Sequence, residues 1–248
     1  MKLQNKIAVI TGGNSGIGWA AAQEFKAQGA RVIIIGRNAE AVVQAAKDLG
    51  GDTLGVTADV SRVADIDRAF HTIGKATERM DILFVNAGIA KFAPLADSTE
   101  ALFDEMTDTN LKGAYFTVQR ALPLLSEGAS VIFTSSAVVH FGMAGASIYT
   151  AGKGALNSLV KTLALEFASR KIRVNVVSPG PIATPIFGKM GMSKEEMDKV
   201  SAGILAQVPL GRFGEAAEIA RAVTFLASSE SSYVTGTELV VDGAMSQQ

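Results

Sequence analysis

The sequence of 248 residues contains no cysteine and only two histidines, His71 and His140. The absence of cysteine excludes disulfides, thiol catalysis and cysteine-bound metals. Two histidines so far apart in the chain leave little from which to build a zinc site. We therefore expect no metal at the functional site.

Charge of one sign is also lacking, because 23 basic residues face 24 acidic ones. A protein that binds nucleic acid or an anionic membrane would show a basic patch. The apolar run at residues 7–10 is too short for a signal peptide. The uncharged stretch 128–152 has too many hydroxyl groups and glycines for a membrane span. We expect a cytoplasmic protein that acts on a small molecule, without a nucleic-acid or membrane partner.

What the sequence does have is an apolar fraction of 48%, arranged in short runs between amphipathic segments of helical length. The runs that we predict as strands are residues 7–10, 32–35, 53–60, 82–85, 131–134, 173–177 and 238–241. Most of them lack alternation of polar and apolar residues, which is typical of strands buried on both faces of a parallel sheet. The pattern predicts an α/β fold, a Rossmann-type doubly wound parallel sheet of about seven strands with helices on both faces.

No linker or repeat divides the chain, so we predict a single domain over residues 1–248. One irregular insertion, between residues 179 and 214, holds four of the six prolines together with Met190, Met192 and Met197. A segment of this length with adaptable methionines favours a substrate lid, which we place at about 185–212.

The first predicted strand leads into a glycine-rich turn, TGGNSGIG at residues 11–18, and then into a helix at 19–28. Such glycines let the backbone approach a pyrophosphate at the start of a helix. The second strand ends in Gly36, Arg37 and Asn38, where a dinucleotide-binding turn normally has an acidic residue. A guanidinium without a neighbouring carboxylate would bind a 2′-phosphate, so NADP is favoured over NAD.

Later strand ends add to the same crevice, because ligands of open α/β sheets bind at the carboxyl ends of the strands. Asp59 and Val60 end the third strand, and Asp59 suits an adenine amino group. Asn86, Ala87 and Gly88 end the fourth, where small residues would let a ribose pass.

The fifth strand ends in a pair of serines, and Tyr149 and Lys153 follow at the start of a helix at about 149–168. Residues four apart share one helix face, so the phenol and the ammonium group lie side by side. They continue the inward stripe of that helix, formed by Leu156, Leu159, Val160, Leu163, Ala164 and Phe167. A neighbouring cation favours the phenolate, so we expect Lys153 to lower the pKa of Tyr149 into a range useful for proton transfer.

The motifs that combine here are Thr11, Gly12, Gly16, Ile17, Gly18, Asn86, Ala87, Gly88, Asn110, Ser136, Tyr149, Lys153, Pro179 and Gly180. Together they resemble the classical short-chain dehydrogenase/reductase family over essentially the whole chain. The resemblance implies that Tyr149 is the catalytic acid and base and that Ser136 positions the carbonyl. It further implies that Lys153 lowers the tyrosine pKa and binds the nicotinamide ribose, and that Asn110 holds a water linked to Lys153.

The segment after the sixth strand is similar to the part of the family that covers the nicotinamide, with Ile182 and Thr184 near its carboxamide. The residues expected to bind the cofactor are Gly12, Asn14, Ser15, Gly16, Ile17, Gly18, Arg37, Asn38, Asp59, Val60, Asn86, Ala87, Gly88, Tyr149, Lys153, Pro179, Gly180, Ile182 and Thr184. His140, Phe141 and Met143 are expected to line the substrate pocket, although His140 could equally be a polar loop residue.

These features favour an NADP-dependent oxidoreductase that interconverts an alcohol and a ketone or aldehyde by hydride transfer. A 3-oxoacyl-thioester reductase is the main alternative, but an acidic carrier needs a basic lid. The lid charges instead balance: Lys189, Lys194 and Lys199 against Glu195, Glu196 and Asp198. An NAD-dependent sugar or steroid alcohol dehydrogenase stays open. A nucleotide-binding protein without turnover is disfavoured, because no catalytic position is missing.

A second stripe on the helix at 149–168 bears on assembly. It consists of Ala151, Ala155, Ser158, Thr162 and Leu165, which recur at helical spacing and carry no charge. Small residues let another helix approach closely, so we expect this stripe to be a subunit contact. Members of the family are commonly dimers or tetramers built on this helix, and we expect a homo-oligomer, most simply a homotetramer.

Overall fold

The computed structural model describes residues 1–184 and 194–247. Its core is a sheet of seven parallel strands in the order β3-β2-β1-β4-β5-β6-β9. Their bounds are β1 Ile7–Thr11, β2 Arg31–Gly36, β3 Leu54–Thr57, β4 Met80–Val85, β5 Leu125–Thr134, β6 Arg173–Pro179 and β9 Glu238–Val241. The strand order reverses direction between β1 and β4, as in a doubly wound sheet. The predicted fold class is confirmed.

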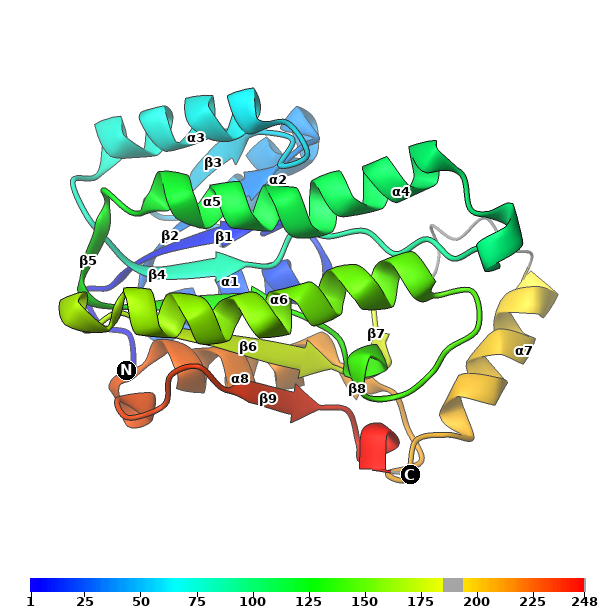
Figure 1. Cartoon of the computed structure of the whole chain (residues 1–248). Helices are drawn as coiled ribbons and strands as arrows, with labels where there is room; N and C mark the ends of the chain where they lie inside the picture. Colours follow the sequence, from blue (N-terminus) through cyan, green and yellow to red (C-terminus); the bar gives the residue numbers. More distant parts are fainter. Residues whose placement is uncertain (185–193, 248) are drawn as a thin grey trace.

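Helices cover both faces of this sheet (Figure 1). They are α1 Gly16–Ala27, α2 Ala39–Leu49, α3 Val63–Ala76, α4 Glu100–Thr107, α5 Gly113–Ala121, α6 Ser147–Glu166 and α8 Ala216–Ala227, whereas α7 Lys194–Leu205 lies beyond the end of the sheet. Successive strand residues point to opposite faces, so Val9 packs with α3, α5 and α6 while Ala8 and Ile10 pack with α1, α2 and α8. This division explains why most strand positions on both faces are apolar.

The strand bounds differ from the prediction by more than two residues at two places. β5 begins at Leu125, whereas the prediction starts this strand at residue 131. The first residues of β5 include the exposed Glu127 and Gly128, so this part of the sequence lacks the apolar run that indicates a buried strand. β3 ends at Thr57 rather than at residue 60. The Asp59 carboxylate accepts hydrogen bonds from the backbone N–H and the hydroxyl of Ser61, and this local turn ends the strand.

The segment between β6 and β9 is more regular than the predicted insertion. Residues Ile182–Ala183 (β7) pair in parallel with Gly214–Glu215 (β8). Along the chain, α7 separates these two strands. The first part of the predicted lid, 185–193, with Lys189, Met190 and Met192, lies outside the described residues. No helix within residues 1–184 and 194–247 is both long enough and apolar enough to span a membrane.

A π-helical turn, η2 (Asp108–Lys112), joins α4 to α5. Asn110 lies inside this widened turn. A π turn holds one residue more than an α turn and is frequent at functional sites. Asn110 is buried there, on the side of the helix that faces the ends of the strands.

The two stripes of α6 differ in exposure as predicted. Leu156, Val160 and Leu163 are buried in the core, and Lys153 joins them with 4% of its surface exposed. Leu165, on the second stripe, is 81% exposed. The single chain therefore leaves an uncharged helix face open to solvent.

Candidate active site

The carboxyl ends of β1, β4 and β5 are tied together by three polar side chains. The Thr11 hydroxyl accepts hydrogen bonds from the backbone N–H groups of Asn86 (2.9 Å) and Ala87 (3.0 Å). The Asn86 side chain donates to the Thr11 carbonyl and accepts from the Thr134 hydroxyl at 3.2 Å. These bonds lie at the reversal of strand order, where open α/β sheets bind ligands. Asn86 is one of the residues expected to bind the cofactor, and in the structure its amide joins the ends of three strands.

The glycine-rich turn lies directly above these strand ends. Gly12 has φ of +67°, and a Cβ there would be 3.0 Å from Asn86 Nδ2. A Cβ at Gly18 would lie 2.2 Å from the Gly12 carbonyl oxygen, so neither position accepts a side chain. Ser15 begins α1 without a side-chain cap, and the first turn of the helix contains no acidic residue. Its free N–H groups and open backbone therefore fit a dinucleotide pyrophosphate.

The end of β2 is closed to an acidic side chain. A Cβ at Gly36 would lie 2.5 Å from Asn14 Oδ1 and 2.7 Å from Val42 Cγ2. The Asn14 side chain thus occupies the space that the Cβ of an acidic residue at position 36 would need. Arg37 is exposed next to it. Asn38 is the N-cap of α2, and its Oδ1 accepts a hydrogen bond from the Ala41 N–H at 2.9 Å.

The segment after β6 reaches back to the first turn. A Cβ at Gly16 would lie 3.8 Å from Thr184, so these two positions, far apart in sequence, are neighbours. Gly180 packs against Asp242, where a Cβ would be 2.6 Å from the Asp242 Cα. Ile182 is buried against the sheet. The glycine turn and the predicted nicotinamide segment therefore face one crevice.

Ser136, Tyr149 and Lys153 converge beside this crevice. Ser136 follows β5, and its hydroxyl lies close enough to the Tyr149 phenol to lower the pKa of the phenol by hydrogen bonding. Lys153 Nζ lies 5.8 Å from the centre of the Tyr149 ring and donates a 2.7 Å hydrogen bond to the Thr134 carbonyl. A Cβ at Gly88 would be 3.5 Å from the same Nζ, so this glycine keeps space open beside the ammonium group.

The electrostatics of the pair differ from the sequence expectation. Burial raises the pKa of Tyr149 above its usual value, and the Ser136 hydrogen bond opposes that rise. Burial also lowers the pKa of Lys153 to about 8. Desolvation disfavours the charged form of both groups and outweighs the attraction between cation and phenolate in the structure of the chain alone.

Asn110 clamps the chain beside these groups. Its Oδ1 accepts a hydrogen bond from the Ile89 N–H and its Nδ2 donates to the Ile89 carbonyl, both at 2.9 Å. The Asn110 side chain therefore holds the strand-to-loop turn after Gly88 from both its amide oxygen and its amide nitrogen. Its Oδ1 would lie 3.0 Å from a Cβ at Gly88.

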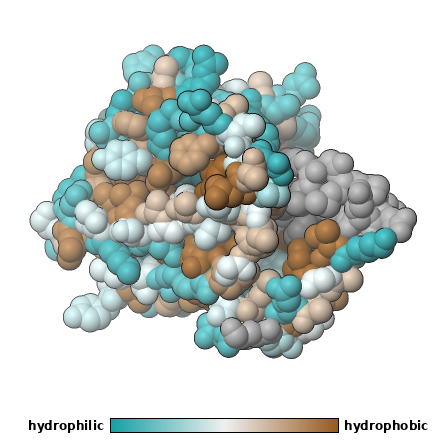
Figure 2. Space-filling model, turned by 45° about the vertical axis from the view of Figure 1, so that its right-hand side comes forward, coloured by the Kyte–Doolittle hydropathy of each residue, from teal (hydrophilic) through white to brown (hydrophobic). Residues whose placement is uncertain are grey.

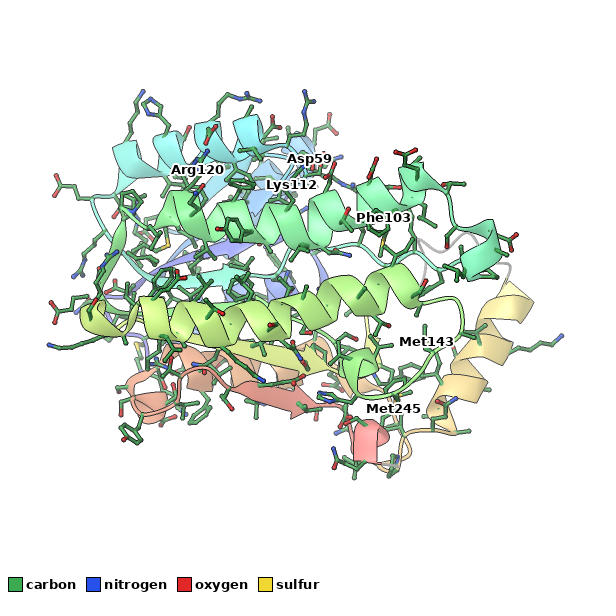
Figure 3. The ribbon with its side chains drawn as sticks, in the orientation of Figure 1. Asp59, Phe103, Lys112, Arg120, Met143 and Met245 are labelled. Carbon is green, nitrogen blue, oxygen red and sulfur yellow. The ribbon has the colours of Figure 1, made fainter. Side chains whose placement is uncertain are left out.

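The residues predicted to line the substrate pocket separate in the structure. His140 Nε2 is hydrogen-bonded to Glu238 Oε1 at 2.8 Å. The same His140 lines a cavity of about 320 Å³ together with Asn157 and Lys161 of α6. Met143 instead lies on the loop before α6, 42% exposed, at the end of the sheet where the strands point (Figure 3).

Sequence analysis missed one aromatic neighbour of Tyr149. The Phe92 ring packs edge to face on the Tyr149 ring, with the centroids 5.7 Å apart and the planes at 72°. Phe92 lies in the irregular loop after β4, where no periodicity indicates which side chain points inward.

The described residues hold no cluster of three or more histidine, aspartate or glutamate side chains that could bind a metal.

Comparison with known proteins agrees with this geometry. Residues 12–246 match the family profile described as enoyl-(acyl carrier protein) reductase. The chain is 39% identical over 249 residues to the oxidoreductase asL5 of Sarocladium schorii, covering 99% of this chain and 98% of that protein. The chain belongs to the short-chain dehydrogenase/reductase family. It is an NAD(P)-dependent oxidoreductase of that family.

Other members of the short-chain dehydrogenase/reductase family differ in their named substrates. The chain is 37% identical to the 3-oxoacyl-[acyl-carrier-protein] reductase of Thermotoga maritima, with 99% of each chain covered. A short-chain dehydrogenase from Burkholderia cenocepacia J2315, solved in complex with NADP, superposes with a TM-score of 0.90 at 29% identity over 99% of each chain.

The buried ammonium group leads to a prediction about stability. We expect Lys153→Met to stabilise the cofactor-free protein by about 2 kcal/mol near pH 7, because methionine avoids the desolvation of a charge and loses one hydrogen bond. As the pH rises above 8, the folded wild type loses this proton while the unfolded chain keeps it up to about pH 10.5. The gain therefore shrinks with rising pH.

Urea unfolding near pH 7 and at about pH 9.5 measures this difference. Lys161→Met, on the same helix but at the exposed Lys161, is the matched control and should leave stability nearly unchanged at both values. A Lys153→Met protein that is less stable than wild type at both pH values would contradict the prediction.

Proposed function

We propose that this enzyme is an NADP-dependent reductase that interconverts a ketone or aldehyde and the corresponding alcohol. The observation that carries the proposal is the convergence of the Ser136 hydroxyl on the Tyr149 phenol, with Lys153 buried beside both. A hydroxyl, a phenol and an ammonium group that share one crevice provide a holder, a proton donor and a charge for a carbonyl oxygen.

In the proposed reaction the carbonyl oxygen accepts hydrogen bonds from Ser136 and Tyr149. The bound reduced nicotinamide supplies the hydride. Tyr149 donates its proton to the oxygen as the alcohol forms, and it takes the proton back in the reverse direction. Lys153 stabilises the phenolate that remains, and the Asn110 clamp on Ile89 keeps the adjoining backbone in place.

The choice of NADP rests on the end of β2. Gly36 leaves no room for an acidic side chain beside Asn14, and Arg37 is exposed where a 2′-phosphate would lie. A guanidinium pairs with phosphate in a charge-assisted, bidentate manner. The NADP complex of the Burkholderia cenocepacia relative supports the same choice.

A 3-oxoacyl thioester is the second candidate substrate, favoured by the Thermotoga maritima relative and by the description of the family profile. The surface beside the site opposes an acidic carrier protein. From the 3₁₀ turn Leu95–Asp97 (η1) through α4 to η2 stand five carboxylates and one lysine: Asp97, Glu100, Asp104, Glu105, Asp108 and Lys112. Like charges repel an acidic partner, so we favour a small free carbonyl compound.

We expect Tyr149→Phe to keep the fold and cofactor affinity but to lower turnover by at least about a hundredfold, because only the proton donor is removed. NADPH oxidation with a panel of ketones and aldehydes measures the loss. Tyr115→Phe deletes the hydroxyl of a half-exposed tyrosine on α5 and should keep full activity. Retention of most activity by Tyr149→Phe would refute the assignment.

Cofactor choice is tested at Arg37. We expect Arg37→Ala to weaken NADP binding by about tenfold or more and to leave NAD binding nearly unchanged, since only NADP carries the 2′-phosphate. Binding titrations with both nucleotides measure the ratio, and Arg221→Ala, at an exposed arginine on α8, is the control. Equal losses for both nucleotides, or a wild type that prefers NAD, would overturn the choice.

We also propose that the uncharged stripe of α6 is a subunit contact. Ala151, Ser158 and Thr162 are exposed along it together with Leu165, and small side chains suit close helix packing across a two-fold axis.

We expect Ala155→Arg to lower the oligomeric state, as measured by sedimentation. Val43→Arg on exposed α2 is the control. A wild type that is monomeric at micromolar concentration, or an Ala155→Arg protein that assembles normally, would contradict this proposal.

A further inference from the structure

The loop after β4, residues 89–93, is held at both ends beside Tyr149. At its start Ile89 exchanges two hydrogen bonds with the Asn110 side chain. At its end the Ala93 N–H donates to the Gly145 carbonyl at 2.9 Å, which joins this loop to the loop before α6. Hydrogen bonds at both ends leave the loop little freedom to change its path.

A third contact restrains the middle of the same loop. Lys91 Nζ lies 2.6 Å from Glu105 Oε2, so the loop is also joined to α4. Phe92 stands between Lys91 and Ala93, so these contacts restrain the backbone that carries its ring. The ring itself contacts Tyr149.

The contact between the two rings is specific. An edge-to-face pair at 5.7 Å is a favoured aromatic geometry, because the positive edge of one ring meets the negative face of the other. Phe92 keeps 37% of its surface exposed in spite of this contact. One ring thus contacts the proposed proton donor and still has apolar surface free for another molecule.

Other apolar side chains are exposed near this loop. Leu95, two residues after Ala93, is 81% exposed, and Met143 lies on the neighbouring loop that Gly145 joins to Ala93. Figure 2 shows hydrophobic side chains in several separate places on the face of the molecule that includes this end of the sheet, among hydrophilic ones. An exposed apolar patch beside a polar catalytic crevice is typical of a ligand-binding surface.

We propose that Phe92 is a specificity-determining residue, the apolar wall on which a flat aryl substituent of the carbonyl substrate packs beside Tyr149. This inference rests on the proposed carbonyl reduction and narrows its substrate class to aryl ketones and aldehydes. The hydroxyls of Ser136 and Tyr149 hold the oxygen, while Phe92 holds the larger substituent. Correct orientation of that substituent raises kcat/KM through the population of reactive complexes.

The test compares two ketones, acetophenone and butan-2-one, with NADPH in the full-length enzyme. We expect the wild type to prefer acetophenone in kcat/KM. Phe92→Ala should reduce the ratio of the two kcat/KM values by about fivefold, the size of effect that one aromatic contact produces. Phe92→Tyr should preserve the ratio. Phe103→Ala removes a 51% exposed ring from α4 and is the matched control, with no expected change.

A pH profile separates this role from a general effect on folding. Burial raises the pKa of Tyr149, and removal of the Phe92 ring admits water to the phenol, which lowers that pKa. Reduction needs the protonated phenol, so the loss of activity toward alkaline pH should begin at a lower pH in Phe92→Ala than in wild type. A ring that only packs on Tyr149 would shift this limb but leave the ketone ratio unchanged, so the ratio is the readout that tests the substrate contact.

The outcomes distinguish the inference from the function on which it rests. If Tyr149-dependent turnover is present but Phe92→Ala keeps the wild-type ratio, or if the wild type prefers butan-2-one, the inference is wrong and the proposed function stands. If no ketone or aldehyde gives Tyr149-dependent turnover, the proposed function itself fails. Circular dichroism checks the fold, and Phe92→Leu, which retains the apolar volume without the ring, replaces Phe92→Ala if the latter does not fold.

Discussion

The hydrogen bonds among Thr11, Asn86 and Thr134 are the constraint on which the site depends. They join the carboxyl ends of β1, β4 and β5, three strands that the chain forms at widely separated positions. Parallel strands provide no tight turn that would align their ends, so polar side chains must do it. The glycine turn packs on Asn86, and Lys153 donates a hydrogen bond to the Thr134 carbonyl. The glycine turn and the Lys153 side chain are therefore both positioned by contacts with this one network.

Function in this fold opposes stability at Lys153. An ammonium group that is 4% exposed and hydrogen-bonded to a neutral carbonyl loses more hydration than it recovers. Apolar packing around α6 offsets this cost in free energy, since Leu156 and Val160 are buried on the same helix face. A negative group that arrives beside Lys153, whether a phenolate or a phosphate-bearing ligand, would relieve it. The empty site is therefore the less stable state of the protein.

Much of the architecture could be predicted because it follows from local patterns. The seven strands are apolar at both faces, and Tyr149 and Lys153 continue an inward helical stripe, so periodicity alone indicates their direction. The early start of β5 could not be predicted, since Glu127 and Gly128 resemble a loop. The π turn at Asn110 leaves no signal, because an extra residue in a helical turn changes no residue type. The Phe92 contact is tertiary, and the pairing of Asn86 with Thr134 joins residues 48 apart.

The hydrogen bond between His140 and Glu238 has a consequence for the order in which the enzyme becomes functional. It joins the 3₁₀ turn after Ser136, η3 (Ala137–His140), to β9, across 98 residues. Glu238 also accepts a hydrogen bond from Ser178, so the last strand fastens two earlier segments at once. During synthesis a chain that has already made Ser136, Tyr149 and Lys153 still lacks this fastening until β9 emerges and pairs with β6. Ser136, Tyr149 and Lys153 are thus translated before the strand that completes the sheet beside them.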